Sequence, residues 1–367
     1  MTNLNQQNKD SGVEEIEGLD TGEDISFGDY PIDTVLIRNE NRTVFDVLRR
    51  IEKGSFVMDP DFQRDFIWPE DKQCKLIESV MMRIPLPVFY LAENSKGKMI
   101  VVDGLQRLST FQRFVNNELK LKLPHQPELD KKFFGDLSPK LQNRIEDCNL
   151  VLYVIDSKVP AQALLDIFER VNGGVPLTRQ QMRNCLFSGR ATRFLKDEAN
   201  TSLFLKATGK SLNKKTMRDR ELINRFCAFQ ILDISEYKGD MDDFLAKALS
   251  KMNSMSENQL STLSTQFRTS LRNNYMVYQV HAFRKHTSLS HGRSVINASL
   301  WDVMSTGLSQ YPESTVESKV ETLRELTVTL FANPGFSEAI SLGTNQVYRV
   351  RTRFKMMREM LSEVLDD

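Results

Sequence analysis

The spacing of apolar residues predicts a mixed α/β segment in the first half of the chain. Short apolar runs typical of strands occur at residues 32–37, 56–58, 88–91, 99–102 and 148–155. Between these runs, apolar residues recur at helical spacing over residues 43–53, 69–83 and 105–115. The turn sequence at 94–97 favours a hairpin between two of the strands. We therefore predict a compact α/β domain over residues 29–158.

The second half of the chain has an almost wholly helical pattern. After Pro160, helical spacing recurs over residues 161–171, 177–188, 222–232, 241–251, 260–283, 295–304, 316–330 and 347–365. No repeat of fixed length is visible along this region. We therefore predict an irregular all-α domain over residues 159–367.

The composition indicates a polar N-terminal segment and limits the classes of function that the protein could have. Residues 1–28 are rich in Gln, Asn, Gly and acidic side chains, which predicts a disordered acidic tail. The 49 Lys and Arg residues balance 49 Asp and Glu residues, so overall charge shows no bias toward nucleic acid or membrane. The 4 cysteines form no C-x-x-C pair. No apolar stretch approaches the ~18 residues of a membrane span, and we expect a cytoplasmic protein.

The segment from Val101 to Thr110 carries the densest candidate chemistry. An apolar run, an Asp103-Gly104 turn and a helical pattern follow one another. A helix that begins after such a turn aims backbone N–H groups at a phosphate. Gln106 and Arg107 add an amide and a guanidinium, and the Asp103 carboxylate is suited to hold Mg²⁺ or a water molecule. Taken alone, an Asp-Gly turn is more typical of an ordinary hairpin or strand–helix turn.

Two further segments place polar side chains between predicted elements. Gln63 and Arg64 lie between a strand and a helix, and the planar fork of arginine suits phosphate. Asn172, Gly173 and Gly174 follow a predicted helix, where two glycines allow close backbone approach. The alternatives are a surface or ion-paired arginine in the first segment and a helix C-cap connector in the second.

Together these segments resemble the N-terminal nucleotide-handling domain of GmrSD-type, modification-dependent restriction enzymes. This family is remotely related to the ParB/sulfiredoxin fold. The likeness covers roughly residues 30–190 and rests on the order and spacing of four motifs: Phe62-Gln63-Arg64 with Trp68, Ile84-Pro85-Leu86-Pro87, Val102 through Thr110, and Phe168 through Gly174 with Leu177.

The resemblance implies a ParB-like α/β fold with a pocket for a nucleoside triphosphate and Mg²⁺. The residues that the resemblance places in this pocket are Gln63, Arg64, Asp103, Gly104, Gln106 and Arg107. We expect the loop of Asn172, Gly173 and Gly174 to close nearby and to take part in cofactor binding. Among the pocket residues, Asp103, Gln106 and Arg107 would be catalytic, and Asp103 would be the metal ligand. Hydrolysis in this family is linked to the gating of attack on DNA.

One position departs from the family pattern. The family motif is Asp-Gly-Gln-Gln-Arg, and this chain has Leu105 in place of the first Gln. If that Gln contacts nucleotide or water, hydrolysis is weakened in this protein, whereas a structural role would make leucine tolerable. Larger family members add a nuclease domain with a His-metal finger, and we identify no nuclease motif in this sequence.

Basic residues gather before a helical core segment in the second half of the chain. Lys206, Lys210, Lys214, Lys215 and Arg218 are the candidates for contacts to the DNA backbone. The alternative is a solvated helix surface, because acidic residues are also present and the net charge is zero.

These observations combine into one functional hypothesis with two alternatives. We expect a nucleotide-binding, NTP-hydrolysing component of a bacterial restriction or anti-phage defence system that acts on or senses DNA. The first alternative is a ParB-like, nucleotide-dependent DNA-binding switch without efficient hydrolysis. The second is a non-enzymatic interaction subunit of a defence complex. The expected partners are modified or phage DNA, a nuclease or other defence-complex subunit and a second copy of the chain, with no membrane.

Overall fold

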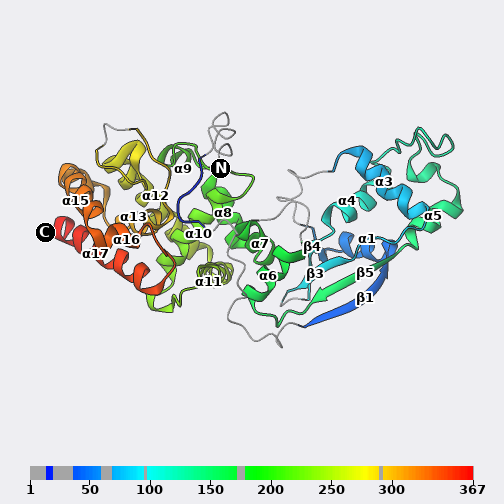
Figure 1. Cartoon of the computed structure of the whole chain (residues 1–367), viewed down its shortest axis with the longest axis horizontal. Coiled ribbons are helices and arrows are strands. Elements are labelled where there is room, and N and C mark those ends of the chain that lie inside the picture. Colours follow the sequence, from blue (N-terminus) through cyan, green and yellow to red (C-terminus); the bar gives the residue numbers. More distant parts are fainter. Residues whose placement is uncertain are drawn as a thin grey trace, which may run out of the picture. The chain divides into compact units, whose positions relative to one another are not determined.

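The computed structural model describes residues 14–19, 36–58, 68–94, 97–171, 178–288 and 292–366. The chain divides into two compact units (Figure 1). An α/β unit lies within residues 27–186, and a helical unit combines the described residues from 187 onward with residues 14–19. The predicted order, α/β first and helical second, is confirmed. The boundary that we expected after residue 158 lies instead at Leu186, because two further helices pack on the sheet.

The α/β unit contains one mixed sheet. Its elements are β1 (Ile37–Thr43), α1 (Val44–Glu52), β2 (Phe56–Val57), α3 (Glu70–Met81), β3 (Phe89–Glu93), β4 (Met99–Asp103), α4 (Leu105–Val115), α5 (Pro139–Glu146), β5 (Asn149–Ile155), α6 (Ala161–Val171) and α7 (Arg179–Leu186), with a 3-10 turn at Phe134–Asp136. The strand order is β1-β5-β3-β4-β2. β1 pairs antiparallel with β5, and β3 pairs antiparallel with β4, as the predicted hairpin required. The β3–β5 and β2–β4 pairs are parallel.

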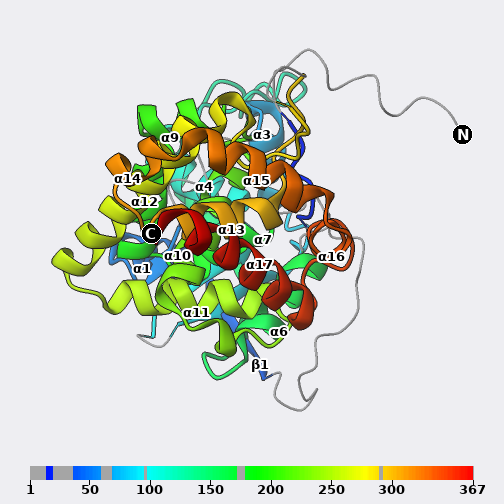
Figure 2. The same ribbon diagram turned by 90° about the vertical axis from the view of Figure 1, so that its left-hand side faces the viewer.

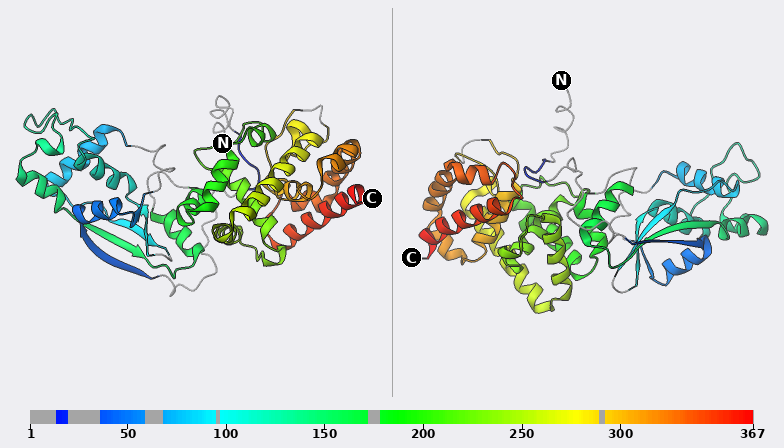
Figure 3. Two further views of the ribbon diagram at one scale, coloured as in Figure 1. Left: turned by 180° about the vertical axis from the view of Figure 1, so that it is seen from behind. Right: turned by 60° about the horizontal axis from the view of Figure 1, so that its bottom comes forward.

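Alternate residues of the central strands face two separate apolar cores, as the two-residue period of a strand requires. Leu91 and Val101 face the core that α1, α3, α4 and α5 complete. Ala92, Ile100 and Val102 face the core that α6 and α7 complete. The sheet is therefore the middle of three layers, and its strands can be followed in Figures 1 and 3.

The edge strand β1 was missed by the sequence-based prediction, which placed a strand at 32–37. Its side chains are mostly charged or polar, and they form a ladder of ion pairs. Arg38 and Arg42 contact Glu40 at N–O distances of 3.0 and 2.6 Å. Charged side chains on an edge strand discourage pairing with other chains. Because β1 buries little apolar surface, the pattern of apolar residues does not predict this strand. The predicted N-cap of the next helix, Thr43, is confirmed.

The helical unit is built around one buried helix. Its helices are α8 (Arg190–Ala199), α9 (Ser202–Ala207), α10 (Arg218–Ile231), α11 (Met241–Ser254), α12 (Glu257–Tyr278), α13 (Ala298–Leu308), α14 (Glu313–Ser318), α15 (Val320–Ala332), α16 (Pro334–Ala339) and α17 (Val347–Leu365), with 3-10 turns at Ile234–Glu236 and Gln279–His281. α13 packs against α10, α12 and α17, and Figure 2 shows it at the centre of this unit. Its Trp301 is fully buried and donates a hydrogen bond of 2.6 Å to the Leu222 carbonyl. No helix in the described ranges is long and apolar enough to cross a membrane.

Residues 14–19 lie against the helical unit, although the sequence predicted a disordered acidic tail there. The Glu14 N–H donates to the Ser211 carbonyl at 2.8 Å. Its carboxylate accepts from the buried Arg284 at 2.6 Å and from Arg293 at 2.5 Å. The acidic character that suggested solvation instead serves to pair two arginines of the helical unit.

A buried charge cluster joins three helices of the helical unit. Asp302 accepts two hydrogen bonds from Arg225, at 2.8 and 2.7 Å, and a third from Arg353 at 2.9 Å. The Asp302 and Arg353 side chains are fully buried, and that of Arg225 is 3 % exposed. Burial lowers the pKa of Arg353, whereas for Arg225 the attraction of Asp302 outweighs burial and the pKa is raised. One carboxylate therefore holds two arginines between α10, α13 and α17.

Candidate functional site

The turn between β4 and α4 can be formed only with glycine at position 104. Gly104 has a φ of 101°, in the left-handed region that other residues rarely adopt. A Cβ atom at this position would lie 2.2 Å from the Phe89 ring of the neighbouring strand. The predicted strand–turn–helix arrangement is confirmed, with α4 beginning at Leu105. The first hydrogen bond within the helix joins the Leu108 N–H to the Gly104 carbonyl, so three backbone N–H groups lack partners inside the helix.

Arg107 points inward, toward the β3–β4 hairpin, rather than toward solvent. Its guanidinium donates to the Pro87 carbonyl, to the Val88 carbonyl at 3.1 Å and to Asp103 Oδ2 at 2.6 Å. It also lies over the Phe89 ring, with its Cζ atom 4.2 Å from the ring centroid. The residue is 8 % exposed, and burial lowers its pKa although Asp103 favours the charged form. In this structure Arg107 therefore holds the Asp103 carboxylate and the backbone before β3, and its predicted phosphate contact stays a prediction.

The Gln106 side chain holds the backbone that precedes α3. Its Oε1 atom accepts a hydrogen bond of 3.0 Å from the Trp68 N–H. The Gln73 amide donates to the Trp68 carbonyl at 2.6 Å, and Arg113 in turn donates to Gln73 Oε1 at 2.8 Å. Sequence reasoning missed Gln73 and Arg113, because their link to Trp68 arises only when α3 and α4 pack together. Gln106 thus anchors the end of the connection between β2 and α3.

Most of that connection, residues 59–67, and the segment with the two glycines, residues 172–177, lie outside the described residues. Gln63 and Arg64 belong to residues 59–67, and Asn172, Gly173 and Gly174 belong to residues 172–177. Their part in a nucleotide pocket therefore stays a prediction.

Ion pairs join the two helices on either side of residues 172–177. Arg179 at the start of α7 pairs with Asp166 at 3.2 Å and with Glu169 at 2.8 Å, both from α6. Thr178 and Gln181 cap the start of α7 reciprocally, with hydrogen bonds of 2.7 and 3.3 Å. These contacts fix the ends of both helices near the segment that carries the two glycines.

Asp103 is the carboxylate that the turn presents to solvent. Its side chain is 33 % exposed, and Arg107 engages Oδ2, which leaves Oδ1 for a further ligand. Within the described ranges, no group of three or more His, Cys, Asp or Glu side chains could hold a metal ion. Since Mg²⁺ in phosphate sites commonly takes one or two carboxylates together with phosphate oxygens, Asp103 suits an ion that arrives with a nucleotide.

Four of the five predicted DNA contacts are exposed on the helical unit. Lys206, Lys210, Lys214 and Lys215 are exposed, whereas Arg218 is half-buried and pairs with Glu221 at 2.7 Å. The Lys206 ammonium also lies over the Tyr275 ring, 4.4 Å from its centroid. The lysine side chains belong to α9 and to the connection between α9 and α10.

Comparison with known proteins gives one match. Residues 44–188 match the family model described as GmrSD restriction endonuclease, N-terminal domain. No curated protein and no solved structure matches the chain. The matched range begins at α1 and ends two residues after α7, and it includes the whole Asp103–Arg107 turn. Residues 44–188, which make up most of the α/β unit, are therefore similar to the N-terminal domain of GmrSD restriction endonucleases.

Proposed function

We propose that the α/β unit binds a nucleoside triphosphate at the Asp103–Arg107 turn and hydrolyses it, within a restriction or defence system that acts on DNA. The similarity of residues 44–188 to the GmrSD N-terminal domain supports the restriction or defence role. The nucleotide proposal rests on the Gly104 turn, which is left-handed, closed against Phe89 and followed directly by the free N–H groups of α4. Such a turn accepts phosphate oxygens on backbone N–H groups and on the positive end of the helix.

Asp103 is the residue to which we assign the chemistry. Arg107 holds its carboxylate through Oδ2, so that Oδ1 is oriented toward a water molecule or a metal ion. Mg²⁺ bound with the nucleotide would neutralise the charge that develops on the phosphates. Gln106 on α4 holds Trp68, which lies between the segment with Gln63 and Arg64 and the start of α3. The ParB/sulfiredoxin-like assignment is part of this proposal, supported by the order of the motifs and by the strand–turn–helix at Asp103.

Replacing Asp103 by asparagine is expected to lower the rate of nucleotide hydrolysis by about 100-fold or more, the usual cost of losing one electrostatic group from a reaction site. Phosphate release with ATP and with GTP measures the rate, and calorimetry measures binding. Glu118→Gln, which removes an exposed carboxylate beyond the end of α4, is the matched control. Wild-type binding without turnover would favour the switch alternative, and no binding would favour the interaction subunit.

Leu105 allows a second test of the same proposal. Its side chain packs against the apolar core of α1, α3 and α4, which supports a structural role for position 105. Leu105→Gln, which restores the family residue, is therefore expected to leave the hydrolysis rate within about 2-fold of wild type, because a side chain that only packs does not add to stabilisation of the transition state. A large rise in rate would show that the missing Gln limits turnover.

We further propose that the exposed lysines of the helical unit contact the DNA backbone. Replacing Lys206, Lys210, Lys214 and Lys215 together by glutamine should weaken DNA binding and reduce the slope of log K against log salt by up to ~0.9 per lost phosphate contact. Fluorescence anisotropy at several salt concentrations measures both effects. The control is the same change at four other exposed lysines of this unit, Lys238, Lys247, Lys251 and Lys355. An equal loss in both variants would overturn this assignment. A nuclease or other defence subunit and a second copy of the chain remain proposed partners.

A further inference from the structure

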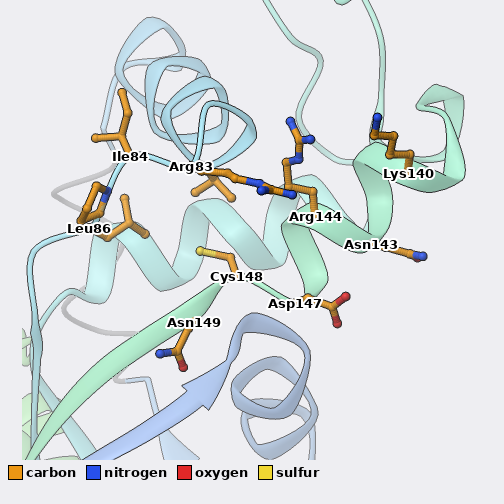
Figure 4. A pocket seen from close by; sticks show the side chains of 11 residues that line it. Arg83, Ile84, Leu86, Lys140, Asn143, Arg144, Asp147, Cys148 and Asn149 are labelled. Atoms are coloured by element: carbon orange, nitrogen blue, oxygen red, sulfur yellow. The ribbon is translucent and has the colours of Figure 1, made fainter.

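A pocket of about 460 Å³ lies in the α/β unit outside the Asp103–Arg107 turn (Figure 4). Its walls come from the end of α3, the residues that follow it, α5 and the first residue of β5. None of its lining residues belongs to the motifs that carry the proposed nucleotide site, except for the Ile84-Pro85-Leu86 segment. The volume falls within the range of small-molecule sites.

The pocket has an excess of positive charge. Arg83, Lys140 and Arg144 line it together with one acidic residue, Asp147. Among the described residues, no ion pair engages Arg83 or Lys140. Arg144 is half-buried, and its guanidinium donates to the Met81 carbonyl at 2.8 Å, which holds this charge at the pocket wall. Figure 4 shows the Arg83 side chain extended toward Arg144.

Arg83 occupies a backbone position that normally favours glycine. Its φ is 62°, directly after the last turn of α3. The Arg83 N–H donates to the Val80 carbonyl and the Ile84 N–H to the Ser79 carbonyl, both at 2.9 Å, which is the Schellman pattern of a helix end. An arginine at this position has a steric cost that glycine would not have.

An apolar wall and two amides complete the pocket. Ile84, which is 48 % exposed, and its neighbours Pro85 and Leu86 form the apolar side. Asn143 and Asn149 supply hydrogen-bond donors and acceptors. Arginine and lysine bind phosphate, an exposed apolar surface accepts a base, and amides pair with base edges.

We propose that this pocket is a second anion site, which binds a single nucleotide through its phosphate and its base. The nucleotide is either free or the 5′-phosphorylated end of a strand. The segment 84–88 connects the pocket to the turn described above, because Ile84–Leu86 form the pocket wall while Arg107 holds the carbonyls of Pro87 and Val88. The proposal does not depend on hydrolysis at Asp103.

Cys148 offers a direct measure of occupancy. It lines the pocket and is partly exposed, whereas Cys74, Cys185 and Cys227 are buried. Burial raises the pKa of the Cys148 thiol, so alkylation is best followed at mildly alkaline pH. We expect AMP, or a 5′-phosphorylated single-stranded oligonucleotide, to slow the alkylation of Cys148, as measured by mass spectrometry of its peptide. Whichever of the two ligands protects Cys148 at the lower concentration is the form that the pocket binds, a free nucleotide or a strand end. Protection by inorganic phosphate measures the contribution of the phosphate group alone.

Arg83→Gly is the decisive variant, because glycine relieves the backbone strain while it removes the charge. We expect the concentration needed for protection to rise about 10-fold or more, as for the loss of one charge-assisted hydrogen bond. Lys131→Gly is the matched control, since Lys131 is also exposed, has a φ of 62° and lies outside the pocket. The same protection should persist in Asp103→Asn, which separates this site from the proposed hydrolytic one. Protection by neither nucleotide form, or equal protection in Arg83→Gly and wild type, would overturn the proposal.

Discussion

Replacing Asp302 by asparagine is expected to lower the free energy of unfolding of the helical unit by about 3–5 kcal/mol, the usual cost of breaking a buried ion pair. Asp302 is the acceptor for both Arg225 and Arg353, and all three side chains are at least nine-tenths buried. Without the carboxylate, two buried guanidinium groups lose the charged acceptor that they share. The expected result is a large loss of stability or a chain that fails to fold.

The two tryptophans make this measurement specific to one unit. Trp301 lies in the core of the helical unit, and Trp68 lies in the α/β unit. In a Trp68→Phe background, denaturant unfolding followed by fluorescence therefore reports the helical unit alone. The control is Glu321→Gln, which breaks an ion pair to Arg324 from a carboxylate that is 80 % exposed and should cost less than about 1 kcal/mol. Similar losses in the two variants would contradict the assignment of Asp302.

Replacing Arg107 by lysine is expected to destabilise the α/β unit by about 2–3 kcal/mol and to impair nucleotide binding together with it. The planar guanidinium donates to two carbonyls and one carboxylate at once, and a lysine ammonium cannot reproduce that geometry. Loss of these bonds frees the segment before β3 and the Asp103 carboxylate. Function and stability should therefore fall together.

Hydrogen exchange distinguishes this role from a direct phosphate contact. In Arg107→Lys, amides of residues 84–110 should exchange faster, while amides of α13 and α17 in the helical unit should remain protected. A direct contact would instead lower nucleotide affinity and leave exchange in the free protein unchanged. Arg113→Lys is a useful comparison, because Arg113 makes a single side-chain contact of 2.8 Å, to Gln73, and one weaker bond to the Glu118 carbonyl.

The predictions that succeeded rest on local signals. The start of α4 at Leu105 follows from an Asp-Gly turn before a helical pattern, and α6 spans the predicted residues 161–171. The β3–β4 hairpin follows from two apolar runs around a short turn. Each of these elements is specified by residues within about one turn or one strand of one another, where propensity and spacing decide the structure.

The errors have a different origin. The strand β1 is nearly all polar because it lies at an edge. In the acidic segment 14–19, Glu14 pairs with Arg284 and Arg293, and Glu17 pairs with Lys285. The unit boundary was placed too early because α6 and α7 read as ordinary amphipathic helices, and only packing on the sheet assigns them to the α/β unit. In each case the decisive partner lies far away along the chain.

The candidate site divides in the same way. The sequence predicts the residue types of the site, and it predicts the glycine turn because a left-handed turn at a helix start needs Gly104. The order and spacing of the motifs predict the family resemblance. The sequence does not predict the directions in which the side chains point. Arg107 turns inward because three acceptors and the Phe89 ring converge on it, and Gln106 turns toward Trp68 because α3 packs beside α4. The Arg83–Arg144 pocket exists only where α3 and α5 meet, since residues 61 positions apart have no shared pattern until folding brings them together.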